Sequence, residues 1–284
     1  MFTLHNGDCL EYMKTLQPAS IDTLITDPPY SSGGQFRGDR TKNTNSKYLG
    51  TSKYQELPEN ITDFGGDNRD QRSWAFWCMT WLSECFRIMK PESLAIVFTD
   101  WRQLPSLTDA YQGAGFVWRG VGVWDKTWAS SRPMAGRFMH QAEYFVWGTK
   151  GALPFDFSKD CLPGVFSIPT EKMTERVHPT QKPVDLIKQF IRISGNVVID
   201  PFMGGGTVGV ACIQTGKDFV GCEADPKYFS AAEKRIKSAV FQPSFLTPSN
   251  NRLQPTAFGV GQPQLFSLLG SSQADESSAT HGGG

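Results

Sequence analysis

The sequence predicts an α/β fold, a doubly wound and mostly parallel sheet with one antiparallel strand and with loop insertions. Three observations lead to this fold class. Short β-rich runs alternate with amphipathic helical stretches along residues 1–240, which is typical of parallel strands covered by helices on both faces. A glycine-rich turn at 204–206 joins a strand to a helix. Two runs, 116–124 and 143–147, alternate as an antiparallel pair would.

Each expected element has its own reason in the sequence. Strands are expected where β-branched and apolar residues form short runs, at 21–26, 93–99, 116–124, 143–147, 196–199 and 219–222. Helices are expected where apolar side chains recur three or four positions apart, at 74–89, 104–111, 183–193, 207–214 and 226–239. Trp74, Cys78 and Trp81 share one face of the first helix. Gly113 and Gly115 are expected to end the second.

Composition and charge exclude several classes of protein. The 284 residues hold 28 Lys and Arg against 28 Asp and Glu, so the net charge is zero and a nucleic-acid surface must be a local patch. Neither a signal peptide nor an apolar run of about 20 residues is present, so we expect a cytoplasmic protein with no membrane partner. The six cysteines form no CxxC pair, so we expect neither a disulfide framework nor a metal site.

We expect one folded domain over residues 1–240 and a tail over 241–284. Half of the tail is Ser, Gly, Pro or Gln, and this composition predicts disorder. Two long stretches of the domain, 31–73 and 125–180, lack regular alternation, and such loops in a compact domain are usually functional or disordered.

The first motif with a chemical meaning is Asp27-Pro28-Pro29-Tyr30, directly after a strand. The exocyclic amine of a planar base is a poor nucleophile, because its lone pair is delocalised into the ring. The Asp27 carboxylate and the Pro28 carbonyl could each accept one N–H and direct that lone pair outward. The two prolines fix φ and stiffen the loop, and a base could stack on Tyr30. A proline-rich strand exit without chemistry is the alternative.

The second motif is Asp200-Pro201-Phe202-Met203-Gly204-Gly205-Gly206-Thr207, where a strand ends in a glycine-rich turn before a helix. Glycines let the backbone approach a ligand closely. The next strand ends with Glu223, and an acid in this place commonly binds ribose hydroxyls. The spacing is neither GxGxxG nor that of a phosphate loop, so it indicates an adenosine rather than a pyrophosphate. A glycine-rich turn without a ligand is the alternative.

The chain resembles the permuted, beta-class DNA amino-methyltransferases of bacteria and phages, in which the catalytic motif precedes the cofactor motif. Asp27–Tyr30 is similar to the catalytic motif of that family, in its adenine-N6 form, and Asp200–Gly206 is similar to its S-adenosylmethionine loop. His178–Pro183 and Asn6–Cys9 are similar to two further family segments. The resemblance covers about 1–30 and 178–240. It implies the S-adenosylmethionine-dependent methyltransferase fold, with S-adenosyl-L-methionine as cofactor.

The resemblance also implies the site residues. The catalytic set is Asp27, Pro28, Pro29 and Tyr30. The cofactor-binding set is Asp8, Asp200, Phe202, Gly204, Gly206, Thr207, Glu223, Thr180 and Lys182. Within this set Glu223 is expected at the ribose, with Asp225 as the competing acid, and Asp8 at the adenine. Thr180 and Lys182 are expected near the methionine carboxylate, although Thr180 as a helix N-cap and Asp8 as an exposed turn remain alternatives.

Double-stranded DNA is the expected partner, and loops are expected to bind it. The basic residues that we assign to DNA binding are Arg37, Arg40, Lys42, Lys47, Arg132 and Arg137. Trp118, Trp124 and Trp128 are interleaved with cations, but for Trp118 and Trp124 packing on the sheet is the preferred interpretation. The family places its target-recognition region at about 150–176, and this short stretch predicts a short or relaxed recognition sequence.

The sequence therefore predicts an S-adenosylmethionine-dependent, site-specific DNA methyltransferase that modifies adenine N6 after base flipping. Two alternatives stay open, a DNA cytosine-N4 methyltransferase and a non-catalytic DNA-binding relative. A nicotinamide-dependent oxidoreductase would not explain Asp27–Tyr30. Some members of the class are homodimers, and any restriction endonuclease of a restriction-modification pair would be a separate chain.

Overall fold

The computed structural model describes residues 1–31, 69–128, 135–153, 160–171, 177 and 180–241. Within these residues the strands are β1 (Phe2–Asn6), β2 (Ile21–Thr26), β3 (Met89–Thr99), β4 (Val117–Asp125), β5 (Ala142–Thr149), β6 (Val165–Ser167), β7 (Val197–Asp200) and β8 (Asp218–Glu223). The helices are α1 (Cys9–Thr15), α3 (Gln71–Ile88), α4 (Leu104–Gly113), α5 (Val184–Ile191), α6 (Thr207–Gln214) and α7 (Pro226–Phe241). The expected tail and most of the expected 31–73 loop lie outside the described residues, so the domain division stays a prediction.

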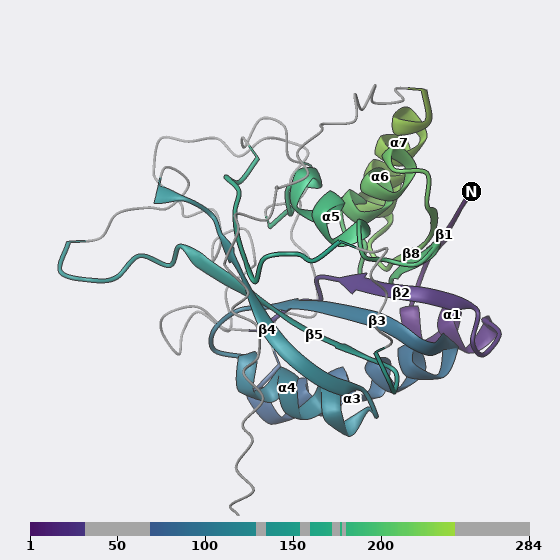
Figure 1. Cartoon of the computed structure of the whole chain (residues 1–284). Helices are drawn as coiled ribbons and strands as arrows, with labels where there is room; N and C mark the ends of the chain where they lie inside the picture. Colours follow the sequence, from purple (N-terminus) through teal and green to yellow (C-terminus); the bar gives the residue numbers. More distant parts are fainter. Residues whose placement is uncertain (32–68, 129–134, 154–159, 172–176, 178–179, 242–284) are drawn as a thin grey trace, which may run out of the picture. The chain divides into compact units, whose positions relative to one another are not determined.

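The eight strands form one sheet in the order β1-β8-β7-β2-β3-β5-β4-β6. Figure 1 labels β1, β8, β2, β3, β5 and β4 of this sheet. The first five strands of this order pair in parallel. Strand β5 is antiparallel to both of its neighbours, β3 and β4, whereas β6 is again parallel to β4. Strand β5 therefore runs alone against the others, and the predicted mostly parallel sheet with one antiparallel strand is confirmed.

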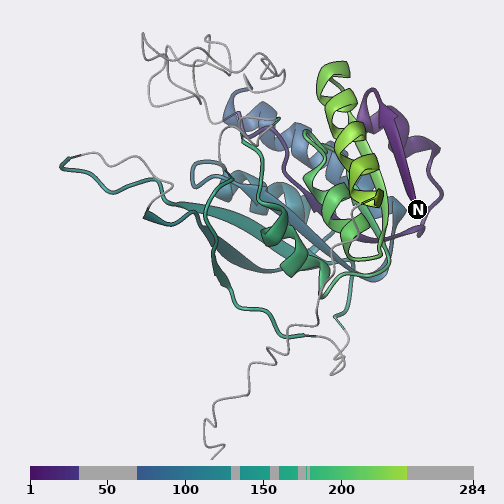
Figure 2. The ribbon, with the colours of Figure 1, turned by 90° about the horizontal axis from the view of Figure 1, so that it is seen from above.

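Helices cover both faces of the sheet, as Figure 1 shows. Helices α1, α3 and α4 pack on one face over a core that includes Met13, Trp81 and Leu107. Helices α5, α6 and α7 pack on the other face over a core that includes Phe190 and Phe219. Helices α6 and α7 lie side by side in the second view (Figure 2). Burial of apolar surface, worth about 25 cal/mol per Å², is the main force that holds the layers together.

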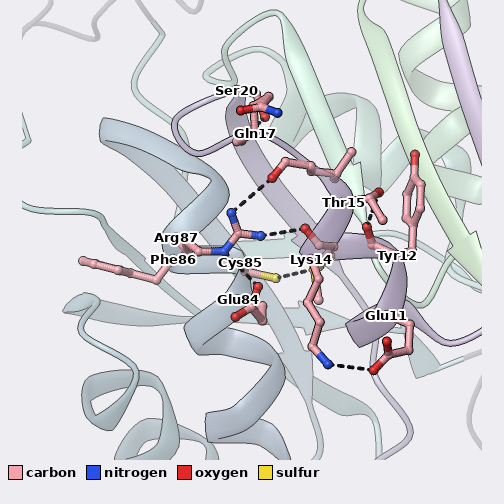
Figure 3. Close-up of polar contacts among 12 residues, drawn as sticks. Glu11, Tyr12, Lys14, Thr15, Gln17, Ser20, Glu84, Cys85, Phe86 and Arg87 are labelled. Atoms are coloured by element: carbon pink, nitrogen blue, oxygen red, sulfur yellow. Dashed lines mark hydrogen bonds and ion pairs between the residues drawn. The ribbon is translucent and has the colours of Figure 1, made fainter.

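Arg87, near the end of α3, connects that helix to the end of α1 (Figure 3). Its guanidinium donates to the carbonyl oxygens of Met13 and Leu16 over 2.7 and 3.1 Å, and to Glu84 over 2.9 Å. The last carbonyls of a helix lack partners of the regular helical pattern. The Met13 carbonyl accepts the Leu16 N–H over 3.0 Å, and Arg87 adds a side-chain donor to it and to the Leu16 carbonyl. This contact lies at the amino end of β3, at the opposite edge of the sheet from the carboxyl ends of the parallel strands.

Four observed elements differ most from the expected ones. Strand β3 begins at Met89, directly after α3, rather than at Ser93. Strand β1 and helix α1 were not predicted, because the β1 side chains are exposed or only half-buried and form no apolar run. The three-residue strand β6 is too short to give a pattern, and its pairing with β4 is decided by the tertiary structure.

Candidate active site at the carboxyl edge of the sheet

The register of three adjacent strands brings the two predicted motifs together. Leu24 of β2 pairs with Ile199 of β7, and Asp200 pairs with Gly221 of β8. The segments that follow these strands therefore leave the sheet at one edge, where ligands of open α/β sheets bind. The Thr26 hydroxyl donates a buried 2.6 Å hydrogen bond to Asp200 Oδ1 and so links the ends of β2 and β7 directly.

Asp27 follows β2, and both of its carboxylate oxygens accept hydrogen bonds. Lys182 Nζ lies 2.5 Å from Oδ2, and the Tyr30 hydroxyl donates to Oδ1. The Pro29 carbonyl accepts a 2.7 Å bond from Trp74 Nε1, which anchors the Asp27–Tyr30 loop to α3. The four residues of the motif thus form a loop that is anchored to α3. The Asp27 side chain in this loop is 25% exposed.

Glu143, which is not among the predicted site residues, belongs to the same site. Its Oε1 lies 2.8 Å from the Tyr30 hydroxyl and 2.7 Å from Lys182 Nζ, and its Oε2 lies 3.5 Å from Lys126 Nζ. Because β5 is antiparallel, its first residues lie at the edge where the other strands end. Glu143 pairs with Trp124 near the end of β4. The only sequence feature that could have indicated Glu143 is its place as an acidic residue at the start of the predicted antiparallel strand.

The electrostatics of this cluster depend on Lys182, which is 5% exposed and lies between two carboxylates. Burial and the nearby Glu143 raise the pKa of Asp27, against the opposing effect of Lys182. Burial opposes ionisation of Glu143 as well, but Lys182 and Lys126 lower its pKa below the usual value. Burial and the two carboxylates raise the pKa of Tyr30, so its hydroxyl stays protonated and acts as a donor.

The glycine-rich turn after β7 has the backbone shape that its sequence predicts. Gly204 and Gly206 have φ of +47° and +76°, in the left-handed region that favours glycine. A Cβ on Gly206 would lie 2.9 Å from Ala232 Cβ in α7. Asp200 Oδ1 accepts from the Phe202 N–H over 3.0 Å, and burial raises the pKa of Asp200 to about 7.

Glu223, at the end of β8, faces this turn. Its Oε2 accepts a 2.9 Å bond from the Gly204 N–H, and its Oε1 accepts one of the same length from the Asp225 N–H. Burial raises the pKa of Glu223. The side chain of Asp225 has another task, because its Oδ1 accepts from the N–H groups of Lys227 and Tyr228 at the start of α7.

The other predicted residues lie as follows. Asp8 is the N-cap of α1, where its Oδ1 accepts from the N–H groups of Leu10 and Glu11 over 2.8 and 3.1 Å. Thr207 is buried as the first residue of α6, and Phe202 packs against Trp77 and Trp81 of α3. Thr180 is half-buried before α5, and Arg137 is exposed. The remaining predicted DNA-binding residues, Arg37, Arg40, Lys42, Lys47 and Arg132, lie outside the described residues.

The site fits a nucleoside better than a metal ion. A carboxylate has about four acceptor positions, so Glu223 can accept ribose hydroxyls beside its two backbone donors. The glycines of the turn leave backbone without side chains next to it. In the part of the chain that the structure describes, no three His, Cys, Asp or Glu side chains form a metal-binding group. No helix among the described residues is long and apolar enough to cross a membrane.

The fold is that of the S-adenosylmethionine-dependent methyltransferases. M1.HpyAVI in complex with S-adenosylmethionine matches 83% of this chain and 99% of its own, with a TM-score of 0.60 and 22% identity. The cytosine-N4-specific PvuII DNA methyltransferase matches 85% of this chain and 92% of its own, with a TM-score of 0.58 and 17% identity.

The chain belongs to the DNA methylase family N6_N4_Mtase, whose family model matches residues 21–167 and 162–234. The Escherichia coli (strain K12) protein YubD is 29% identical over 81% of this chain and 88% of its own length. The type II methyltransferase M.HinfI of Haemophilus influenzae is 26% identical over 93% of this chain and 74% of its own. The type II methyltransferase M2.DpnII of Streptococcus pneumoniae is 25% identical over 83% and 89%. The predicted amino-methyltransferase family is thus confirmed.

Proposed function

We propose that this protein methylates the exocyclic N6 of adenine in double-stranded DNA, with S-adenosyl-L-methionine as methyl donor and with the target base flipped out of the duplex. One observation carries the proposal. The Asp27–Tyr30 loop and the glycine-rich turn leave the sheet at one edge, and the Thr26–Asp200 hydrogen bond links them. An acceptor for an amino group and a nucleoside site therefore lie next to each other, as transfer between two bound molecules requires.

The residues of the Asp27–Tyr30 loop match the needs of the target amine. The Asp27 carboxylate and the Pro28 carbonyl each accept one N–H, which favours a pyramidal nitrogen with its lone pair directed outward. The Tyr30 ring offers a face on which the flipped base stacks. The cofactor, when bound, supplies the methyl group of the sulfonium centre. The chain contributes orientation and hydrogen bonds, and no covalent intermediate on a protein side chain is needed.

The residues proposed to hold the cofactor surround the ends of β7 and β8. Glu223 binds the ribose hydroxyls, and the turn with Phe202, Gly204 and Gly206 lies along the nucleoside. Asp8 and Thr180 stay predicted contacts of this ligand. The predicted contact of Lys182 with the methionine carboxylate likewise stays a prediction. Its ammonium lies between Asp27 and Glu143, so we propose that it also positions the Asp27 carboxylate.

Exposed aromatic and basic side chains near the same edge support DNA as the partner. The segments that follow β3 and precede β5 carry Trp101, with 51% of its surface exposed, and His140. The two rings are parallel with centroids 6.3 Å apart, and the Arg102 guanidinium lies 4.6 Å over the Trp101 ring. Arg137 and Trp128 are exposed in the neighbouring segments. Cations and aromatic rings together suit phosphate contact and base stacking. A homodimer and a separate endonuclease chain stay predictions.

Cytosine N4 is the second candidate target. It is also an exocyclic amine on a planar base, and one matching structure is described as cytosine-N4-specific. Asp at position 27 favours adenine, because in the family that the sequence resembles the Asp form of the motif usually accompanies adenine N6.

Nucleoside mass spectrometry tests the proposal and the choice of base together. Unmethylated duplex DNA is incubated with the protein and labelled S-adenosylmethionine, and Asp27→Ala serves as the inactive variant. We expect label in N6-methyladenine with the wild type and none with Asp27→Ala. Label in N4-methylcytosine would show that cytosine, not adenine, is the target base, and the proposed mechanism would still hold. If the protein binds the cofactor but labels no nucleoside, the proposal is contradicted.

A further inference from the structure

The Tyr30 hydroxyl lies between two carboxylates but carries a single hydrogen. It is a donor to Asp27 Oδ1 and lies 2.8 Å from Glu143 Oε1. A phenol can donate to only one of them at a time. Glu143 therefore provides an alternative acceptor for a hydroxyl that is bonded to the catalytic aspartate.

Such an exchange would make room on Asp27 for an amino group. In the structure its Oδ2 contacts Lys182 Nζ and its Oδ1 accepts from Tyr30, so both oxygens already have donors. An incoming N–H can use a remaining lone pair of either oxygen, but it crowds the donor already bound there. The Tyr30 hydroxyl is a donor that can be displaced, because Glu143 Oε1 lies 2.8 Å from it. The displaced donor would be costly to leave without a partner in this largely buried site. Glu143, 14% exposed and within reach of both donors, can receive it.

We propose that Glu143 is a positioning residue for methyl transfer, which accepts the Tyr30 hydroxyl and holds Lys182 when Asp27 binds the amino group of the target base. This inference rests on the proposed function. Glu143 acts through Tyr30 and Lys182 and does not itself touch the reacting atoms.

The charges around Glu143 support this role. Lys182 and Lys126 lie on two sides of its carboxylate, at 2.7 and 3.5 Å. With two cations near it, Glu143 stays ionised and remains a strong acceptor. The charged and titratable groups that face the Asp27–Glu143 pair among the described residues are Tyr30, Lys182, Lys126 and Asp200.

Two substitutions of Glu143 distinguish the effect of its acceptor oxygen from the effect of its negative charge. Glu143→Ala removes both, whereas Glu143→Gln keeps an acceptor oxygen of the same reach. We expect the single-turnover rate of DNA methylation to fall about 10- to 100-fold in Glu143→Ala, the range that matches one buried donor without a partner. Glu143→Gln should recover part of that rate. Cofactor affinity, measured by calorimetry, should change less than about threefold in either variant.

A double variant tests whether Glu143 acts through the hydroxyl. Tyr30→Phe removes the donor that Glu143 receives. The rate loss of Tyr30→Phe/Glu143→Ala should therefore be smaller than the product of the two single losses. Multiplicative losses would contradict the exchange of the hydroxyl between Asp27 and Glu143.

The pH profile gives a second readout that simple loss of packing would not move. The negative charge of Glu143 raises the pKa of Asp27, so Glu143→Gln should shift the acidic limb of the single-turnover profile to lower pH. Glu84→Gln is the matched control, because Glu84 pairs with Arg87 at the opposite edge of the sheet, and its rate and profile should equal those of the wild type.

The outcomes distinguish the inference from the proposed function. A wild type that labels no base contradicts the proposed function. A wild type that methylates DNA while Glu143→Ala does so at the same rate overturns the role of Glu143. If Glu143→Ala does not fold, Glu143→Gln decides, and an unshifted acidic limb in that variant overturns the inference.

Discussion

Lys182 Nζ lies 2.5 Å from Asp27 Oδ2, although 155 residues separate the two in sequence. The Lys182 side chain is 5% exposed, and its ammonium also contacts Glu143. Burial opposes its charge, but the two carboxylates raise the pKa of Lys182, so it stays protonated. A buried cation with two anionic partners keeps the Asp27 carboxylate oriented in a site that partly excludes water. The protonation states of Asp27, Glu143 and Lys182 therefore depend on one another.

Substitution of Lys182 by Met should impair both folding and methyl transfer. Removing one partner of a buried ion pair costs about 3–5 kcal/mol, which urea unfolding would detect. Without the ammonium the pKa of Asp27 rises further, so the acidic limb of the rate profile should move to higher pH, opposite to the shift expected for Glu143→Gln. The control is Lys14→Met, since the Lys14–Glu11 pair is exposed. Equal rate profiles for Lys182→Met and the wild type would contradict this assignment.

Asp200 should make stability depend on pH. Burial raises its pKa from 3.8 to about 7, so the folded protein disfavours the charged form. The contribution of Asp200 to the free energy of unfolding is therefore largest at acidic pH, and it is lost as the pH rises through about 7.

Asp200→Asn tests that dependence, because an amide oxygen can still accept from Thr26 and Phe202. Relative to this variant, the free energy of unfolding of the wild type should fall by roughly 1–4 kcal/mol between pH 5 and 8. Asp22→Asn is the comparison. The pKa of Asp22 is lowered: burial opposes this shift, but Lys90 at 2.6 Å outweighs it. Its difference from the wild type should be flat over the same range. A flat difference for Asp200→Asn would contradict the prediction.

Substitutions of Glu223 and Asp225 should differ in their effect on S-adenosylmethionine affinity. If Glu223 binds the ribose as proposed, Glu223→Gln should lower S-adenosylmethionine affinity about 10-fold or more, on the order of one charged hydrogen bond. Asp225→Asn should leave this affinity nearly unchanged, because Asp225 caps α7. Calorimetric titration of both variants measures the contrast, and a larger affinity loss in Asp225→Asn would reverse the assignment.

Asp8 can be tested with two substitutions. Asp8→Ala removes the N-cap of α1 and should lower the free energy of unfolding by about 0.5–2 kcal/mol. Asp8→Ser retains a capping oxygen, so stability should return. If Asp8 also contacts the adenine of the cofactor, as the family resemblance implies, Asp8→Ser should bind S-adenosylmethionine more weakly at normal stability. Unchanged affinity in Asp8→Ser would limit the role of Asp8 to capping.

The sequence alone determined the fold class and the positions of both motifs. Strand–helix alternation is a local pattern, and the Asp27–Tyr30 and Asp200–Thr207 segments carry their chemistry in adjacent residues. The strand exits at Thr26 and Asp200 were therefore predictable, as was the single antiparallel strand. The exposed or half-buried strand β1 and the short strand β6 were not, because neither produces an apolar pattern.

Only the tertiary structure decided which distant side chains meet. Glu143 is an ordinary acid at the start of a strand until the antiparallel direction of β5 brings it to the edge where β2 and β7 end. Lys182 could not be assigned to Asp27 from sequence, because the contact depends on where the segment before α5 passes over the sheet. Asp8 and Asp225 likewise proved to be helix caps through their hydrogen bonds. Periodicity reports local burial, whereas strand order and direction determine contacts between distant segments.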